Sequence, residues 1–90
     1  MGYPLIESIL LPMSRSSEAQ KRKVRELLRD LREAAELRQV DLAARLKRPQ
    51  SFVSKFESGE KTLNFLEVKE VCQALGIPLV DFVRRFEEGS

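Results

Sequence analysis

The side chains best suited to chemistry lie close together in mid-chain and can donate or accept hydrogen bonds: Gln50, Ser51, Ser54 and Lys55. Read as a helix, residues 48–59 turn these groups to one face. The opposite face is an apolar stripe that must meet a core, made of Phe52, Val53 and Phe56. Short donors and acceptors on a helix suit the major groove of DNA, whose base edges present both kinds of group. We therefore expect a DNA-reading helix here.

The chain lacks the residues that most catalytic and metal sites require. It has no histidine and one cysteine, Cys72, so neither a zinc site nor a histidine-based dyad can be built. Cys72 lies in an apolar stripe, which predicts a buried, inert thiol. Ser54 and Lys55 are adjacent and diverge by about 100° on a helix, so the lysine cannot serve that serine as base. We expect no catalytic residue, no metal and no cofactor.

Composition indicates one small globular domain. Ninety residues, 33% of them charged and 42% hydrophobic, fit a folded, soluble protein. No apolar run reaches the roughly 20 residues of a membrane span, so we expect a cytoplasmic protein with no membrane partner. The net charge of +2 is uneven. Residues 14–48 hold eleven Lys/Arg against six Asp/Glu, and residues 49–90 hold five against seven. This asymmetry indicates one face that meets a polyanion.

The first residues form a separate segment. Residues 1–12 are apolar and bracketed by Pro4 and Pro12, without the basic start and small-residue cleavage site of a secretory signal. Three interpretations stay open: an extension upstream of a natural start at Met13, an ordered arm that pads a dimer interface, or a short edge strand. The first is favoured, so residues 1–16 are expected to be a poorly ordered arm ahead of a domain at 17–90.

The rest of the chain predicts five helices, with no strand signal beyond the N-terminal arm. A Ser17–Gln20 capping box starts the first, at about 18–36. The second, 39–46, is followed by a tight turn into Pro49, placed at the first position of the third. Gly59 ends the third helix, Asn64 caps a fourth that runs to about 75, and the fifth covers 79 to about 87.

Apolar residues at helical spacing give the expected core. The first two helices contribute Val24, Leu27, Leu28, Leu31, Ala35, Val40, Leu42, Ala43 and Leu46. The last two contribute Leu66, Val68, Val71, Cys72, Leu75, Leu79, Phe82, Val83 and Phe86. Two short helices joined by a tight turn, at 39–46 and 49–58, make a helix-turn-helix.

These residues resemble the Cro/repressor-type helix-turn-helix, the XRE family. The resemblance covers about residues 24–87 and rests on three pieces: Gln39-x-x-Leu42-Ala43-x-x-Leu46, then Gln50-Ser51-x-Val53-Ser54-Lys55-x-Glu57-x-Gly59, then Ala74-Leu75-Gly76. It implies an all-α, five-helix repressor-like domain whose second helix spans the DNA backbone while the third enters the major groove.

The resemblance also implies roles for single residues. Base reading falls to Gln50, with Ser51, Ser54 and Lys55 adding base-edge or phosphate contacts. Phosphate contacts fall to Gln39, Lys61 and Thr62, and the unusually basic turn adds Lys47 and Arg48. Arg32 and Glu57 occupy the positions of a structural ion pair that joins the first helix to the third.

The chain departs from the family at several turns. Glu36 and Lys47 stand where glycine is frequent, so Lys47 is expected to adopt a positive φ. Arg38 replaces the usual Ser or Thr cap of the second helix. Pro49 replaces that of the third, which removes a capping oxygen.

The function expected from the sequence is sequence-specific DNA binding by a transcriptional regulator. A homodimeric repressor on an inverted-repeat operator fits best, because a symmetric site needs two reading helices about 34 Å apart. The alternative is a protein-binding adaptor or antitoxin-like partner of a toxin or other regulator, which would dock through the exposed ends of the last two helices, near Val83 and Phe86.

Overall fold

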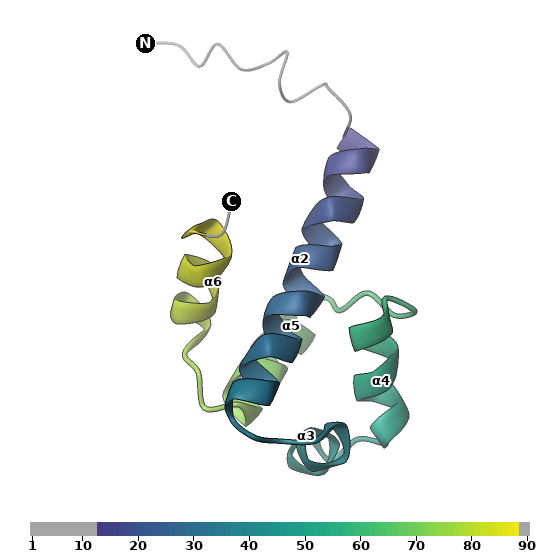
Figure 1. Cartoon of the computed structure of the whole chain (residues 1–90), viewed down its shortest axis with the longest axis vertical. Coiled ribbons are helices and arrows are strands. Elements are labelled where there is room, and N and C mark those ends of the chain that lie inside the picture. Colours follow the sequence, from purple (N-terminus) through teal and green to yellow (C-terminus); the bar gives the residue numbers. More distant parts are fainter. Residues whose placement is uncertain (1–12, 89–90) are drawn as a thin grey trace.

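The computed structural model describes residues 13–88, and within that range the only regular secondary structure is α-helix. The helices follow in the order α2 (Met13–Ala34), α3 (Gln39–Leu46), α4 (Gln50–Ser58), α5 (Phe65–Ala74) and α6 (Leu79–Glu88) (Figure 1). The expected all-α, five-helix architecture is confirmed. No strand occurs between residues 13 and 88. The possible edge strand or arm at residues 1–12 lies outside this range.

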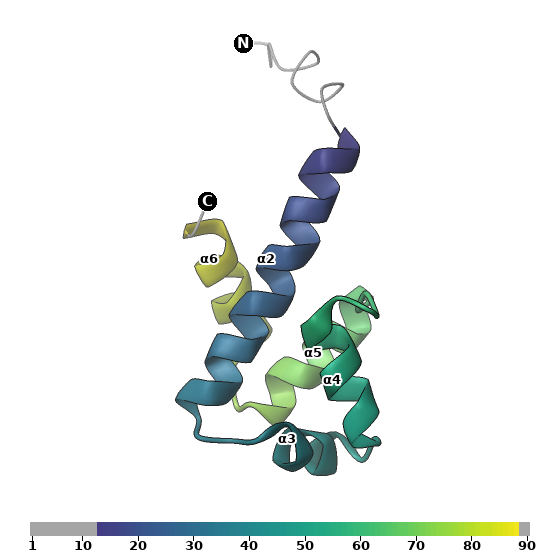
Figure 2. The ribbon, with the colours of Figure 1, turned by 45° about the vertical axis from the view of Figure 1, so that its right-hand side comes forward.

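The long helix α2 organises the packing. In two views 45° apart, α6 lies on one side of α2, while α3 and α4 lie on the other side and across its C-terminal end (Figures 1 and 2). Apolar side chains from every helix meet in one core: Leu28, Leu31, Leu42, Ala43, Leu46, Val53, Phe56, Val71, Cys72, Leu75 and Phe82. Cys72 is fully buried, and desolvation raises the pKa of its thiol to about 11, as an inert thiol requires.

Helix α2 begins earlier than the sequence signal indicated. The helix starts at Met13, so Ser17 and Gln20 are exposed residues inside it and the expected capping box there is wrong. No proline or glycine interrupts residues 13–34, and nothing therefore stops the helix between Pro12 and the expected cap. At the other end α2 stops at Ala34, and Ala35 is exposed in the following turn rather than in the core.

Three helices end in the same left-handed turn. Glu36, Lys47 and Gly76 follow α2, α3 and α5 with φ of 60°, 57° and 75°. In each case the next backbone N–H donates five residues back, for example Arg48 N to the Ala43 oxygen at 3.0 Å. This pattern is the Schellman ending of a helix, which glycine adopts without a steric penalty. The positive φ expected for Lys47 is confirmed, and Glu36 shares it.

The helix starts use different caps. At α5, Asn64 Oδ1 accepts from the Glu67 N–H at 2.8 Å and Glu67 returns the bond to the Asn64 N–H at 3.0 Å, which confirms the expected cap. At α3, the Arg38 N–H donates to Asp41 at 2.9 Å. At α4, Pro49 is the N-cap rather than the first helical residue, so the helix begins one residue later than expected, and Pro49 provides no capping side chain.

Several apolar residues expected in the core face outward. Val40 and Leu66 are 43% and 69% exposed, and Val83 is 43% exposed. Each belongs to a helix with only one buried stripe, and the apolar sequence pattern is wider than that stripe. Their exposure leaves apolar surface on α5 and α6 that the fold itself does not use. Between residues 13 and 88, no helix is both long and apolar enough to span a membrane.

Candidate nucleic-acid interface

Helix α4 presents its polar face to solvent because its apolar face is anchored. Val53 and Phe56 are 0% and 1% exposed, which fixes the rotation of the helix about its axis. Gln50, Ser51 and Lys55 are consequently exposed on the outer face. The structure therefore brings these three predicted base-reading residues together on one open surface.

Ser54 is the exception within the predicted reading set. It is half-buried, and its hydroxyl donates to the Ser51 carbonyl oxygen at 3.3 Å. A serine that donates back along its own helix keeps its lone pairs for an incoming donor. Ser54 is thus placed to accept a hydrogen bond at the edge of the surface rather than to lead base recognition.

A buried ion pair ties this helix to α2. Arg32 donates from Nε to Glu57 Oε2 at 2.7 Å and from Nη2 to Oε1 at 2.9 Å, while Nη1 donates to the Leu37 oxygen at 2.7 Å. The two side chains are 9% and 4% exposed. The hydrogen bonds to Glu57 raise the pKa of Arg32, so the guanidinium stays charged. A bidentate pair fixes orientation as well as distance, and it holds α4 rigidly.

Gln39 joins the same network. Its Nε2 donates to Glu57 Oε1 at 2.9 Å, so part of the amide predicted to bind phosphate is used inside the protein. Gln39 is the first residue of α3, and the free N–H groups of that helix end remain available to an anion. Gln39 and Ser54 line one open hollow of about 370 Å³ between α2, α3 and α4.

Arg29 lies on the rim of this hollow and was missing from the predicted site. It is exposed and has no ion-pair partner among residues 17–88. In the sequence Arg29 is one of several cations between residues 21 and 32, and nothing there distinguishes it from the others. Only the packing of α2 against α4 shows that Arg29 lines the hollow, together with Arg32 and Ser54.

Arg48 is turned inward. Its Nη2 donates to Glu70 Oε1 at 2.9 Å, and its guanidinium lies over the Phe52 ring, 4.4 Å from the centroid. Its Nε is buried and has no hydrogen-bond partner among the described residues. These contacts join the turn between α3 and α4 to α5 and leave Arg48 less free to bind a phosphate than the sequence indicated.

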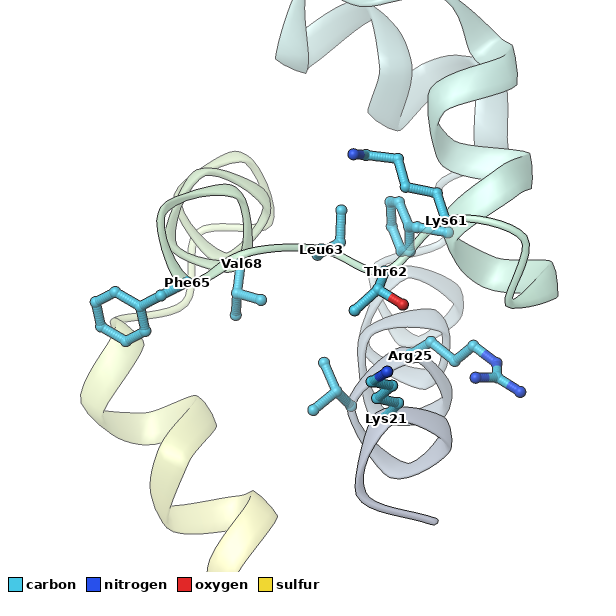
Figure 3. A pocket seen from close by; sticks show the side chains of 9 residues that line it. Lys21, Arg25, Lys61, Thr62, Leu63, Phe65 and Val68 are labelled. Atoms are coloured by element: carbon cyan, nitrogen blue, oxygen red, sulfur yellow. The ribbon is translucent and has the colours of Figure 1, made fainter. Parts of the chain in front are cut away.

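Like Arg48, Lys61 contacts a carboxylate and the Phe52 ring within the protein. Its Nζ lies 3.4 Å from Glu67 Oε2 and 5.7 Å from the centroid of Phe52. The backbone N–H of Asn64 is the main cause of the lowered pKa of Glu67, and Lys61 adds to it, so this carboxylate remains ionised. Thr62, next in the chain, is exposed on the wall of a cavity of about 150 Å³ that Lys21 and Arg25 also line (Figure 3).

Lys47 remains the most available cation of the turn. It is exposed at the left-handed position after α3, and none of the ion pairs among residues 17–88 includes it. At the other end of α3, Arg38 donates to Asp41 from its side chain and its backbone and lowers the pKa of Asp41 to about 2. Helix α3 therefore begins at the ion pair of Arg38 and Asp41. It is followed by Lys47, a cation without an ion-pair partner among residues 17–88.

Comparisons with known proteins bear on this arrangement. Residues 24–86 match a family model described as a helix-turn-helix domain. Among solved structures, the chain is similar to an XRE-family like protein from Pseudomonas syringae pv. tomato str. DC3000, with 35% identity and a TM-score of 0.81. That match covers 87% of this chain and 95% of the other. No curated protein sequence matches the chain.

Proposed function

This chain belongs to the XRE-type helix-turn-helix family of DNA-binding domains, and on that premise we propose that it is a sequence-specific regulator of transcription, acting as a dimeric repressor. The observation that carries the proposal is the outer face of α4. Gln50, Ser51 and Lys55 are exposed together on a helix that two buried side chains and a buried ion pair hold in place. A rigid helix with a short, polar outer face is suited to the major groove.

In this proposal Gln50 leads base recognition. It is exposed at the first turn of α4, and the N-terminal residues of a recognition helix approach the base edges most closely. Its amide can bond both N6 and N7 of an adenine. Ser51 and Lys55 add contacts to neighbouring base edges or to phosphate, and Ser54 accepts at the rim.

The phosphate contacts follow from charge and availability. Lys47 lies in the turn before α4, and Arg29 lines the hollow beside Ser54. Both are exposed and neither has an ion-pair partner among residues 17–88, so they bind phosphate at low cost. Arg48, Lys61 and Thr62 contribute more weakly, because Glu70 and Glu67 already partly neutralise the two cations. Gln39 contributes through the N-terminus of α3.

A dimer follows from how such a helix reads DNA. One α4 covers a single half-site, and specificity for an inverted repeat requires two copies about one helical turn of DNA apart. The apolar side chains exposed on α5 and α6, among them Leu66 and Val83, support association through that side of the molecule.

The same apolar side chains favour a second function, that of an adaptor or antitoxin-like protein bound by a different protein. Salt separates the two. Binding to a duplex releases counterions, so the slope of log K against log salt falls by about 0.9 for each phosphate contact that is lost. Adaptor binding through apolar surface has no such slope.

The test is a salt titration of duplex binding by fluorescence anisotropy. We expect a steep slope for the natural chain, and a slope lower by about 0.9 for Lys47→Ala and for Arg29→Ala. Arg85→Ala is the matched control, since Arg85 is an exposed cation of α6, on the other side of α2 from α4 (Figure 1). A flat slope for the natural chain, or the same loss for Arg85→Ala, would contradict the proposed surface.

A further inference from the structure

An apolar groove lies on the side of the molecule away from the reading surface. It has a volume of about 160 Å³ and runs between α2 and α6 to the start of α5. Only apolar side chains line it, among them Val24, Phe65, Val68, Val83 and Phe86. Phe65 is 66% exposed and Val83 is 43% exposed, so this surface is open to water in the described part of the chain. None of its lining residues belongs to the proposed DNA-contacting set.

One end of the groove is cationic. Val24, Phe65 and Val68 also line the cavity beside Thr62, so the two hollows adjoin. That cavity includes Lys21 and Arg25 from α2, which Figure 3 shows beside the apolar side chains of its wall. An occupant of the whole groove therefore needs apolar side chains along most of its length and a negative charge toward one end.

The sequence of residues 1–12 meets both requirements. It reads MGYPLIESILLP, and Leu5, Ile6, Ile9, Leu10 and Leu11 are apolar. Glu7 is its only charged side chain. We propose that residues 1–12 pack into the groove of their own chain, with Ile6 and Ile9 against the apolar walls and Glu7 toward Lys21 and Arg25.

The connection is long enough. Val24 lies eleven residues after Met13, or about 16 Å along α2 at 1.5 Å per residue. Ile9 lies four residues before Met13 and Ile6 lies seven before it. An extended chain that reverses before Met13 therefore carries these side chains about 13 Å and about 23 Å back along α2, on either side of Val24, whereas a helix of the same residues would fall short. The first turns of α2 stand clear of the other described helices, which leaves the path along this helix open (Figures 1 and 2).

The proposal assigns the segment a structural and protective role. Docking would cover an apolar surface that otherwise invites association with other proteins. A partner or a second copy would then have to displace residues 1–12 before it could bind in the groove. The inference is independent of DNA binding and is tested without DNA.

A disulfide comparison in the full chain provides the test. Ile9→Cys is combined either with Val83→Cys, inside the groove, or with Val80→Cys, a residue 61% exposed on the same helix and absent from the groove lining. The natural Cys72 is buried and does not compete. We expect the pair at positions 9 and 83 to form an intrachain disulfide at least tenfold faster than the pair at 9 and 80, at micromolar protein concentration.

Two results would overturn the proposal. Similar rates for the two pairs would mean that residues 1–12 have no preference for the groove. Mainly interchain disulfides, seen as dimers on a non-reducing gel, would assign the groove to a second copy instead. Methyl NMR provides an independent readout: Ile9→Asp should shift the signals of Val24 and Val83, whereas Ser8→Asp, which adds the same charge one residue away, should leave them nearly unchanged.

Discussion

The pair of Arg32 and Glu57 shows how much of this site depends on two side chains. Both are almost fully buried, and Arg32 also satisfies the Leu37 carbonyl while Glu57 accepts from Gln39. Replacing Arg32 by methionine would leave a buried carboxylate with only one amide donor. We expect a loss of about 3–5 kcal/mol in the free energy of unfolding, measured by urea denaturation.

A double variant separates the cost of the orphaned charge from the worth of the pair. Arg32→Met with Glu57→Met removes both charges, and replacing a whole buried pair by apolar side chains is often close to neutral. The double variant should therefore be more stable than Arg32→Met alone. A double variant as unstable as the single one would show that shape, rather than uncompensated charge, dominates here.

Asp41 gives a pH dependence with a definite sign. Arg38 lowers the pKa of this carboxyl to about 2 from an ordinary value of 3.8. A carboxyl with a depressed pKa stabilises the fold above its unfolded pKa and loses that contribution as pH falls through the folded pKa. Stability from this group should therefore decline between about pH 4 and pH 2. Carbon NMR titration should place the Asp41 midpoint near the lower value, and Arg38→Ala should move it toward the ordinary one.

Sequence reasoning placed the predicted reading residues Gln50, Ser51 and Lys55 on the exposed face of α4 but could not assign every cation. Gln50, Ser51 and Lys55 follow from one helix and its buried stripe, a local property that periodicity captures. Arg48 was predicted to bind phosphate, yet it contacts Glu70, 22 residues away. No spacing rule connects those two positions, since their contact depends on how α5 packs beside the turn.

At the level of elements, helix ends were predicted well where a backbone signal exists. The bounds of α3 match the expected 39–46, Gly59 ends α4 as expected, and α5 ends at Ala74, close to the expected residue 75. The start of α2 was wrong because a Ser and a Gln at capping spacing also fit inside a continuous helix. A capping motif predicts a helix start only when something upstream breaks the helix.

The left-handed turns allow an element-scale prediction. Lys47 and Glu36 both adopt positive φ, which costs a residue with a Cβ more than it costs glycine. Lys47→Gly and Glu36→Gly should each raise the free energy of unfolding by about 0.5–1 kcal/mol in urea titrations. Their effects on DNA should differ, because only Lys47 lies in the turn before α4. Lys47→Gly should weaken duplex binding, and Glu36→Gly should not.

Equal losses of DNA affinity in these two variants would contradict the phosphate role of Lys47. Destabilisation by both would instead show that the lysine and glutamate side chains make contacts that outweigh the backbone strain. Glu36→Gly thus controls for the backbone change. The remaining difference in DNA affinity between the two variants reports the contribution of the Lys47 charge.

The whole molecule has two surfaces with different chemistry. The surface around α4 is polar and cationic, and the surface formed by α2, α5 and α6 is apolar with a cationic end. The sequence indicated the first through the helix-turn-helix pattern. It indicated the second through the docking site near Val83 and Phe86, but it assigned Val24 and Val68 to the core alone. Periodicity counts apolar positions but does not tell which of them a neighbouring helix covers.

The most direct measurement is selection of bound duplexes from a random DNA library, with the natural chain and with Gln50→Ala in parallel. Gln50 is exposed, so its replacement should leave the fold intact. We expect the natural chain to enrich an inverted repeat, and Gln50→Ala to lose preference at one base in each half-site. A bidentate base contact is worth about 1–3 kcal/mol of discrimination, which is readily visible in such a selection.

The contrary results are equally clear. If Gln50→Ala enriches the same repeat with the same preference at every position, α4 does not read bases through this residue. If the natural chain enriches no sequence at all, the exposed face of α4 does not recognise a DNA sequence, and a protein partner becomes the function to test.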